Sequence, residues 1–220
     1  MKLKDLFENQ EYTFGQWAKD EGVDLNSSNF DCSGSKITSL EGAPTSVNGY
    51  FICINTNITS LEHAPTSVGG GFNCRDANIT SLEHAPTSIG GNFNCNNTNI
   101  ASLQGAPTSV AGSFNCNNIK ITSLENIHHH IHHIGYGLFL NNCSIKSNVL
   151  GVLWIGCDVQ GRPQPDGKAP VFIRLDNKQV EEILNKYLDK IHSEEMTPRE
   201  ALLQAQNELI DADLDEYAEL

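Results

Sequence analysis

Apolar and polar positions in this chain repeat with a period of 21 residues over about half of its length. In each unit a Phe is followed two residues later by a Cys, and an Ile, a Leu, a Pro and a Val or Ile then come at fixed positions. The two leading columns are Phe30, Phe51, Phe72, Phe93 and Phe114, and Cys32, Cys53, Cys74, Cys95 and Cys116. A fixed period of this length is typical of a solenoid, in which each repeat forms one turn.

The Phe-x-Cys spacing predicts a short strand in every turn. Side chains two residues apart on an extended chain lie on the same face, so Phe and Cys both point into the core. The Pro of each unit, Pro44 in the first, then favours extended or turning backbone. Each turn has one narrow apolar edge that it can bury only against its neighbours. We therefore predict a parallel sheet of short strands, stacked about 4.8 Å apart.

The repeats run from residue 30 to residue 145, and we interpret the flanking segments as caps of the solenoid. Residues 1–29 are predicted to form a helical N-terminal cap, with one helix at Lys2–Asn9 and a second that Thr13 begins and Gly22 ends. Residues 146–220 are predicted to form a C-terminal cap with two acidic helices. The expected fold class is an α/β repeat solenoid with helices at both ends.

The C-terminal cap carries its own local signals. The apolar run Val149–Cys157 predicts a strand or a core segment, and residues 171–175 alternate as a strand does. Asp176 or Asn177 then begins a helix that reaches about Ile191. A Thr-Pro-x-Glu run at 197–200 predicts a second helix with a capping box, and residues 213–220 are expected to add a last turn.

The last repeat is irregular, because 24 residues separate Phe114 from its equivalent Leu138. Leu140 and Ile145 then take the places of Cys and Ile. The longer arm contains a histidine run, in which Ile127, Ile131 and Ile134 have the spacing of one helical face.

That spacing would leave the histidines His128 with His132, and His129 with His133, as i, i+4 pairs. Two imidazoles at this spacing on a helix can share one Zn²⁺ or Ni²⁺. The same pattern is typical of a solvated polar face, and no carboxylate or Cys ligand adjoins it in a metal motif. We therefore expect no cofactor and keep a metal site at these four residues as the alternative.

The pattern Val-x-x-x-Phe-x-Cys-x-x-x-x-Ile-x-x-Leu resembles a leucine-rich repeat of the short bacterial type found in secreted effectors. The wording Ile-Thr-Ser-Leu-Glu-x-Ala-Pro-Thr-Ser-Val is more similar to uncharacterised repeat proteins of tailed bacteriophages. The C-terminal runs 207–212 and 215–218 also resemble the ends of those proteins. The resemblance implies a leucine-rich-repeat-like architecture and carries no agreed activity.

Charge excludes some functions. The chain of 220 residues has a formal net charge of −13, so we expect no electrostatic binding of nucleic acid. Charged residues near the N-terminus break any apolar run, and no stretch is long enough for a membrane span, which predicts a cytoplasmic protein, in the host cytoplasm if the source is a phage. Seven cysteines in that compartment should be reduced, and we interpret the Cys column as small buried apolar residues.

The outward-facing residues beside the Phe and Cys columns are the predicted binding surface. Tyr and Arg are favoured at interaction hot spots, and exposed aliphatic residues indicate a contact surface. The alternative for the Asn positions is that amides merely form hydrogen-bonded ladders along the stack. The predicted partner-binding residues are Tyr50, Ile52, Ile54, Asn73, Arg75, Asn94, Asn96, Asn115, Asn117 and Phe139.

We find no nucleophile motif, phosphate loop or paired-carboxylate motif, and so predict a non-enzymatic scaffold that binds another protein. The resemblance suggests a phage protein that binds or inhibits a host factor, such as a defence component. The alternative is a small-ligand or metal-binding protein that uses the His-rich arm or the Asn-lined face. The sequence leaves the oligomeric state open, and also the choice between this face and the acidic C-terminal helices.

Overall fold

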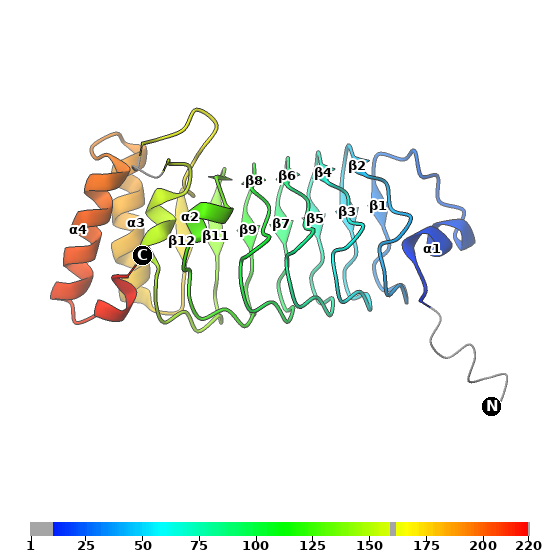
Figure 1. Ribbon diagram of the computed structural model, residues 1–220, viewed down its shortest axis with the longest axis horizontal. Helices are drawn as coiled ribbons and strands as arrows, with labels where there is room; N and C mark the ends of the chain where they lie inside the picture. Colours follow the sequence, from blue (N-terminus) through cyan, green and yellow to red (C-terminus); the bar gives the residue numbers. More distant parts are fainter. Residues whose placement is uncertain (1–10, 159–161, 220) are drawn as a thin grey trace.

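The computed structural model describes residues 11–158 and 162–219, and the predicted helix at Lys2–Asn9 lies outside them. The described chain forms an elongated parallel solenoid with α1 (Phe14–Asp20) at one end and α3 (Lys178–His192) and α4 (Pro198–Asp211) at the other (Figure 1). The predicted fold class, a solenoid of parallel strands with helices at its ends, is confirmed. No helix in the described ranges is both long and apolar enough to span a membrane.

The predicted Phe strands form a seven-stranded parallel sheet, in which each strand pairs with the strand one turn further on. Phe51 pairs with Phe72, for example, and Phe72 with Phe93. The strands in spatial order are β1 (Phe30–Asp31), β3 (Phe51–Ile52), β5 (Phe72–Asn73), β7 (Phe93–Asn94), β9 (Phe114–Asn115), β11 (Gly137–Phe139) and β12 (Phe172–Arg174).

A second parallel sheet of five strands, which we did not anticipate, forms on the return arm of each turn. Its Ser is half-buried or exposed and its Val or Ile is buried, so it closes the core opposite the Phe strands. Its strands in spatial order are β10 (His133–Ile134), β8 (Ser109–Val110), β6 (Ser88–Ile89), β4 (Ser67–Val68) and β2 (Ser46–Val47).

Side chains of equal position stack through the core. The rings of Phe51 and Phe72 lie 5.6 Å apart and nearly parallel, and Phe72 and Phe93 lie 5.9 Å apart. The Ile, Leu and Val columns are buried alongside them. The Cys column is also buried as reduced thiols, and burial raises the pKa of each, as at Cys74, so these cysteines act as small core residues.

The turn after each Phe strand requires a left-handed residue at the second position after Cys. Gly34 begins this column with φ of 68°, and Asn55, Asp76, Asn97 and Asn118 continue it with φ of 52° to 60°. Asn and Asp tolerate this conformation better than other residues with a side chain. Their side chains also bond between turns, since Asn97 Nδ2 donates to Asp76 Oδ1 over 2.7 Å.

The N-terminal cap covers the open end of the Phe stack. Thr13 begins α1 with the expected side-chain cap, in a capping box with Gln16. Phe14 continues the aromatic column, because its ring lies 5.8 Å from that of Phe30 and 5.5 Å from that of Phe51. Trp17 packs against Phe14 at 5.1 Å.

The irregular turn keeps the register that the sequence predicts, since Leu138 pairs with Phe114. The following apolar run forms the 3₁₀ helix η2 (Leu150–Trp154), so the core-segment alternative for Val149–Cys157 is confirmed and the strand alternative is wrong. A strand here would need a free sheet edge, but β12 occupies the edge beside β11. The segment expected to be a separate cap therefore also extends the sheet.

The two C-terminal helices begin where the sequence predicts. Asn177 accepts from the N–H of Val180 at the start of α3, and Thr197 forms the predicted capping box with Glu200 in α4. The expected last turn is the 3₁₀ helix η3 (Asp215–Tyr217).

Helix α3 covers the outer edge of β12 with a side-chain amide. Asn185 Oδ1 accepts from the N–H of Ile173 over 2.8 Å, and Asn185 Nδ2 donates to the carbonyl of Ile173 over 3.0 Å. This pair of bonds reproduces what a neighbouring strand would make. It ends the sheet without an open edge, which would otherwise be a template for association with another chain.

Asn185→Leu is expected to lower the free energy of unfolding by about 1–3 kcal/mol, because Ile173 is buried and its backbone groups would lose their partners. Thermal denaturation followed by circular dichroism measures the effect, and light scattering reports association through the opened edge. The matched control is Asn207→Leu, at an exposed position of α4. Equal melting temperatures for the two variants would refute the role of Asn185.

Candidate functional site

The outer face of the seven-stranded sheet carries a continuous row of side chains, one from each strand. Strand register places Ile52 beside Asn73, Asn73 beside Asn94 and Asn94 beside Asn115, with Phe139 next. We call these five residues the central row. Beyond its two ends the same register continues to Asp31 and to Arg174. The row therefore has an apolar residue at each end and three amides between them.

Tyr50 lies beside the first apolar end and is 57% exposed. Its ring packs over Gly71, where a Cβ would come within 3.4 Å of Cδ1 of the tyrosine. Its backbone N–H is held by Asn29 Oδ1 over 2.8 Å. Gly71 thus leaves room for the tyrosine ring to extend over the next turn.

A groove of about 290 Å³ runs along this face from Tyr50 towards the C-terminal end. We call it the sheet groove. It crosses β3, β5 and β7 and reaches β9, next to the strand that carries Phe139. Its lining residues are Tyr50, Ile52, Gly71, Phe72, Asn73, Asn92, Asn94 and Asn115.

The amides along the sheet groove are oriented by bonds to the backbone. Asn73 Oδ1 accepts from the N–H of Arg75 over 3.1 Å, and Asn94 Oδ1 from that of Asn96 over 3.0 Å. Asn92 Oδ1 accepts from the N–H of Ser113 over 2.8 Å. Because each oxygen is occupied within the chain, these residues present their NH₂ groups as donors to the groove.

The other predicted Asn residues serve the stack itself. Asn96 Oδ1 accepts from the N–H of Asn117 over 2.7 Å, and Asn117 Oδ1 accepts from both the N–H and the Nδ2 of Asn141. These bonds form the ladder that the sequence analysis held as the alternative for the Asn positions. Asn96 and Asn117 therefore have less capacity left for a ligand than Asn73 and Asn94.

Ile54 and Arg75 lie next to the central row, one position further along their turns. Ile54 is half-buried, as is Ile52, so Tyr50 is the most exposed apolar member of this part of the face. Arg75 Nε contacts Asp76 Oδ2 at 3.0 Å, and both side chains are partly exposed. The predicted anchor cluster is brought together, with Tyr50 rather than the isoleucines protruding.

At the other end of the row Phe139 belongs to a cluster of three rings. Phe172 stands between Tyr136 and Phe139, edge to face with both, at 5.2 Å and 5.3 Å. Tyr136 is 55% exposed, and Arg174 lies 5.0 Å from the centre of the Phe172 ring. We call Tyr136, Phe139 and Phe172 the aromatic cluster. Sequence reasoning missed Tyr136 and Phe172; the fact that both stand next to a predicted strand was the available signal.

The prediction of helical His pairs in the irregular arm is wrong. Helix α2 (Ile127–His130) has only four residues, and Ile131 is extended. His132 therefore does not face His128 across a helical turn, and His133 lies in β10, where its Nδ1 is 3.1 Å from the carbonyl oxygen of Asp166. The chain leaves the helix because His132 and His133 bond to the Thr108 carbonyl of the second sheet.

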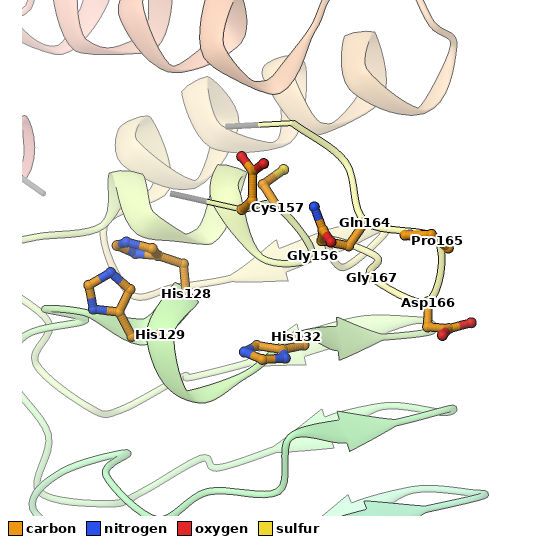
Figure 2. Close-up of a pocket in the computed structure, with 10 residues that line it drawn as sticks. His128, His129, His132, Gly156, Cys157, Gln164, Pro165, Asp166 and Gly167 are labelled. Carbon is orange, nitrogen blue, oxygen red and sulfur yellow. The ribbon is translucent and has the colours of Figure 1, made fainter. Parts of the chain in front are cut away.

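A pocket of about 610 Å³ lies between this arm and the loop after η2. Figure 2 shows His128 and His129 side by side, with His132 further along the arm and Cys157 on the opposite wall. We call this the His pocket. It contains His128, His129, His132, Cys157 and Asp166 among its lining residues. Nowhere in residues 11–158 and 162–219 do three or more His, Cys, Asp or Glu side chains come together as metal ligands.

His128 is the perturbed member of the His pocket. Its ring packs edge to face on Trp154 at 5.7 Å, and its Nδ1 is buried without a hydrogen-bond partner among the described residues. Burial first, then the neighbouring His129 and His130, lowers its pKa from 6.5 to about 4. His128 is therefore neutral at pH 7.

Comparison with protein-family models, with curated proteins and with solved structures gives no match for this chain.

The lowered pKa of His128 makes stability depend on pH. A histidine with a lowered folded pKa contributes stability that is fully present above pH 6.5 and is lost as the pH falls towards 4. Because the ring is only half-buried, we expect about 1 kcal/mol, or about 2–4 °C in melting temperature.

Differential scanning calorimetry at pH 7.0 and 5.0 should show a smaller drop for His128→Phe than for the wild type. The control is His132→Phe, because His132 is exposed. If His128→Phe and the wild type lose the same stability between the two pH values, the burial of His128 has no such effect.

Proposed function

We propose that this chain is a non-enzymatic scaffold that binds another protein through the outer face of its seven-stranded sheet. The observation that carries the proposal is Tyr50, a half-exposed ring held over Gly71 at the end of the sheet groove. Exposed tyrosines in preformed sites are typical interaction hot spots. Side-chain and backbone bonds fix the groove before a partner arrives, which reduces the entropy lost on binding.

Binding rather than catalysis fits the chemistry of this face. The polar side chains of the sheet groove are those of Tyr50 and four asparagines. Amides neither exchange protons near neutral pH nor act as nucleophiles, but they donate and accept hydrogen bonds. The net charge of −13 disfavours nucleic acid as the partner.

We further propose that the protein is phage-encoded, acts in the host cytoplasm and binds a host protein such as a defence component. The support is the resemblance of the 21-residue repeats and of residues 207–218 to repeat proteins of tailed bacteriophages. The leucine-rich-repeat-like architecture is consistent with this role, since solenoids present long, continuous binding surfaces.

The decisive experiment is affinity purification from host cells with the wild type and the Tyr50→Ala, Ile52→Ala, Arg75→Ala triple variant. We expect a stoichiometric protein with the wild type and at least a tenfold loss with the variant, because the loss of a hot-spot cluster costs more than about 1.4 kcal/mol. Titration calorimetry with the purified partner then gives both affinities.

The matched control carries Glu62→Ala, Ser88→Ala and Lys120→Ala, three exposed positions away from the central row. It should bind as the wild type does. Equal binding by the wild type and the Tyr50 triple variant would refute this face as the contact and would direct attention to the acidic C-terminal helices.

A second candidate function, small-ligand binding, is favoured by the His pocket, whose volume of about 610 Å³ suits a small organic molecule. Native mass spectrometry of the protein from its own cells should then show a bound molecule that His129→Asn, His132→Asn removes. The control is His63→Asn, His84→Asn, because both residues have positive φ, which Asn tolerates. A molecule that both double variants retain would place the ligand elsewhere.

A further inference from the structure

The central row has apolar anchors at both ends, and this sets a length for whatever binds across it. Ile52, beside Tyr50, is on β3, and Phe139, within the aromatic cluster, is on β11. Four strand spacings separate them, because β5, β7 and β9 lie between. At about 4.8 Å for each spacing the two anchors are roughly 19 Å apart.

The space between the anchors is neutral and rich in donors. Asn73, Asn94 and Asn115 fill the row between Ile52 and Phe139, and none of them is charged. The oxygens of Asn73 and Asn94 are taken by backbone N–H groups, and Asn115 Nδ2 makes only a long contact of 3.5 Å with the Phe93 carbonyl. A ligand that lies here must therefore offer acceptors without charge, as backbone carbonyls do.

An extended peptide satisfies both conditions. It advances about 3.3 Å per residue, so about six residues cover the distance between the anchors. Side chains in an extended chain alternate between faces with a period of two, so positions separated by six residues point to the same side. Both anchor side chains of one such peptide can therefore face the sheet.

We propose that the partner presents an uncharged, extended segment with apolar or aromatic side chains at positions i and i+6, and that this segment crosses the strands along the solenoid axis. The first side chain packs against Tyr50 and Ile52, and the second against the aromatic cluster. The intervening carbonyls accept hydrogen bonds from the Asn amides. This inference rests on the proposed function, since it names the chemistry of the protein that binds there.

Selection from a random library of displayed linear 12-residue peptides, with the immobilised full chain as target, tests the proposal without a known partner. Enriched peptides are expected to share two apolar residues six positions apart with no charge between them. Ile52→Asn and Phe139→Asn should each weaken these peptides at least about tenfold. Both substitutions introduce the residue that the row already carries on three strands, and melting curves verify that the variants fold.

Deletion of one complete turn, residues 93–113, provides a sharper test. It removes 21 residues and brings the anchors closer by one strand spacing, to roughly 14 Å. The same selection should then yield apolar pairs about four positions apart. Insertion of three residues at the exposed His129, which leaves the row unchanged, is the control and should preserve the spacing of six.

Other outcomes of the selection overturn the proposal. Peptides with a single apolar residue, peptides indifferent to Phe139→Asn, a spacing unchanged by the turn deletion, or no enriched peptide would each do so. Peptides that bind another face would refute the two-anchor segment while leaving a protein scaffold standing. The proposed function fails separately, if the natural partner binds the Tyr50 triple variant as tightly as the wild type.

Discussion

Every part of this molecule depends on contact between residues 21 positions apart. Backbone bonds such as that from the Phe51 N–H to the Gly71 carbonyl link each turn to the next, and the Phe rings stack along the same direction. A single turn has strands of only two residues and no core of its own. Stability is therefore a property of neighbouring turns, as in other solenoids, and the ends must be covered.

The need to stack explains which polar side chains remain for binding. Asn97 and Asn118 bond to the residue one turn before them, while Asn96 and Asn117 bond to the next turn. In contrast, the Asn73 and Asn94 oxygens bond within their own turn, which leaves their NH₂ groups on the outer face. The Asn columns are thus divided between holding the stack and lining its surface, and the second group marks the candidate site.

The features that differ between turns lie near the ends of the array. Tyr50 and Ile52 occupy an early turn, and the aromatic cluster lies where the last turn meets β12. Differences of this kind are not needed for stacking, since the middle turns stack with Asn at the same positions. They are consequently the best indication of a partner, and they lie on one face.

The sequence by itself determined the period, the buried columns, the register across the 24-residue turn and the helix starts at Thr13, Asn177 and Thr197, because each follows from local spacing or capping. Only the tertiary structure showed the second sheet, the chain leaving its helix after His130, and Phe172 standing against Phe139 across 33 residues. It also decided which Asn oxygens are occupied. These outcomes depend on hydrogen bonds and contacts between segments distant in the chain, and local patterns do not contain that information.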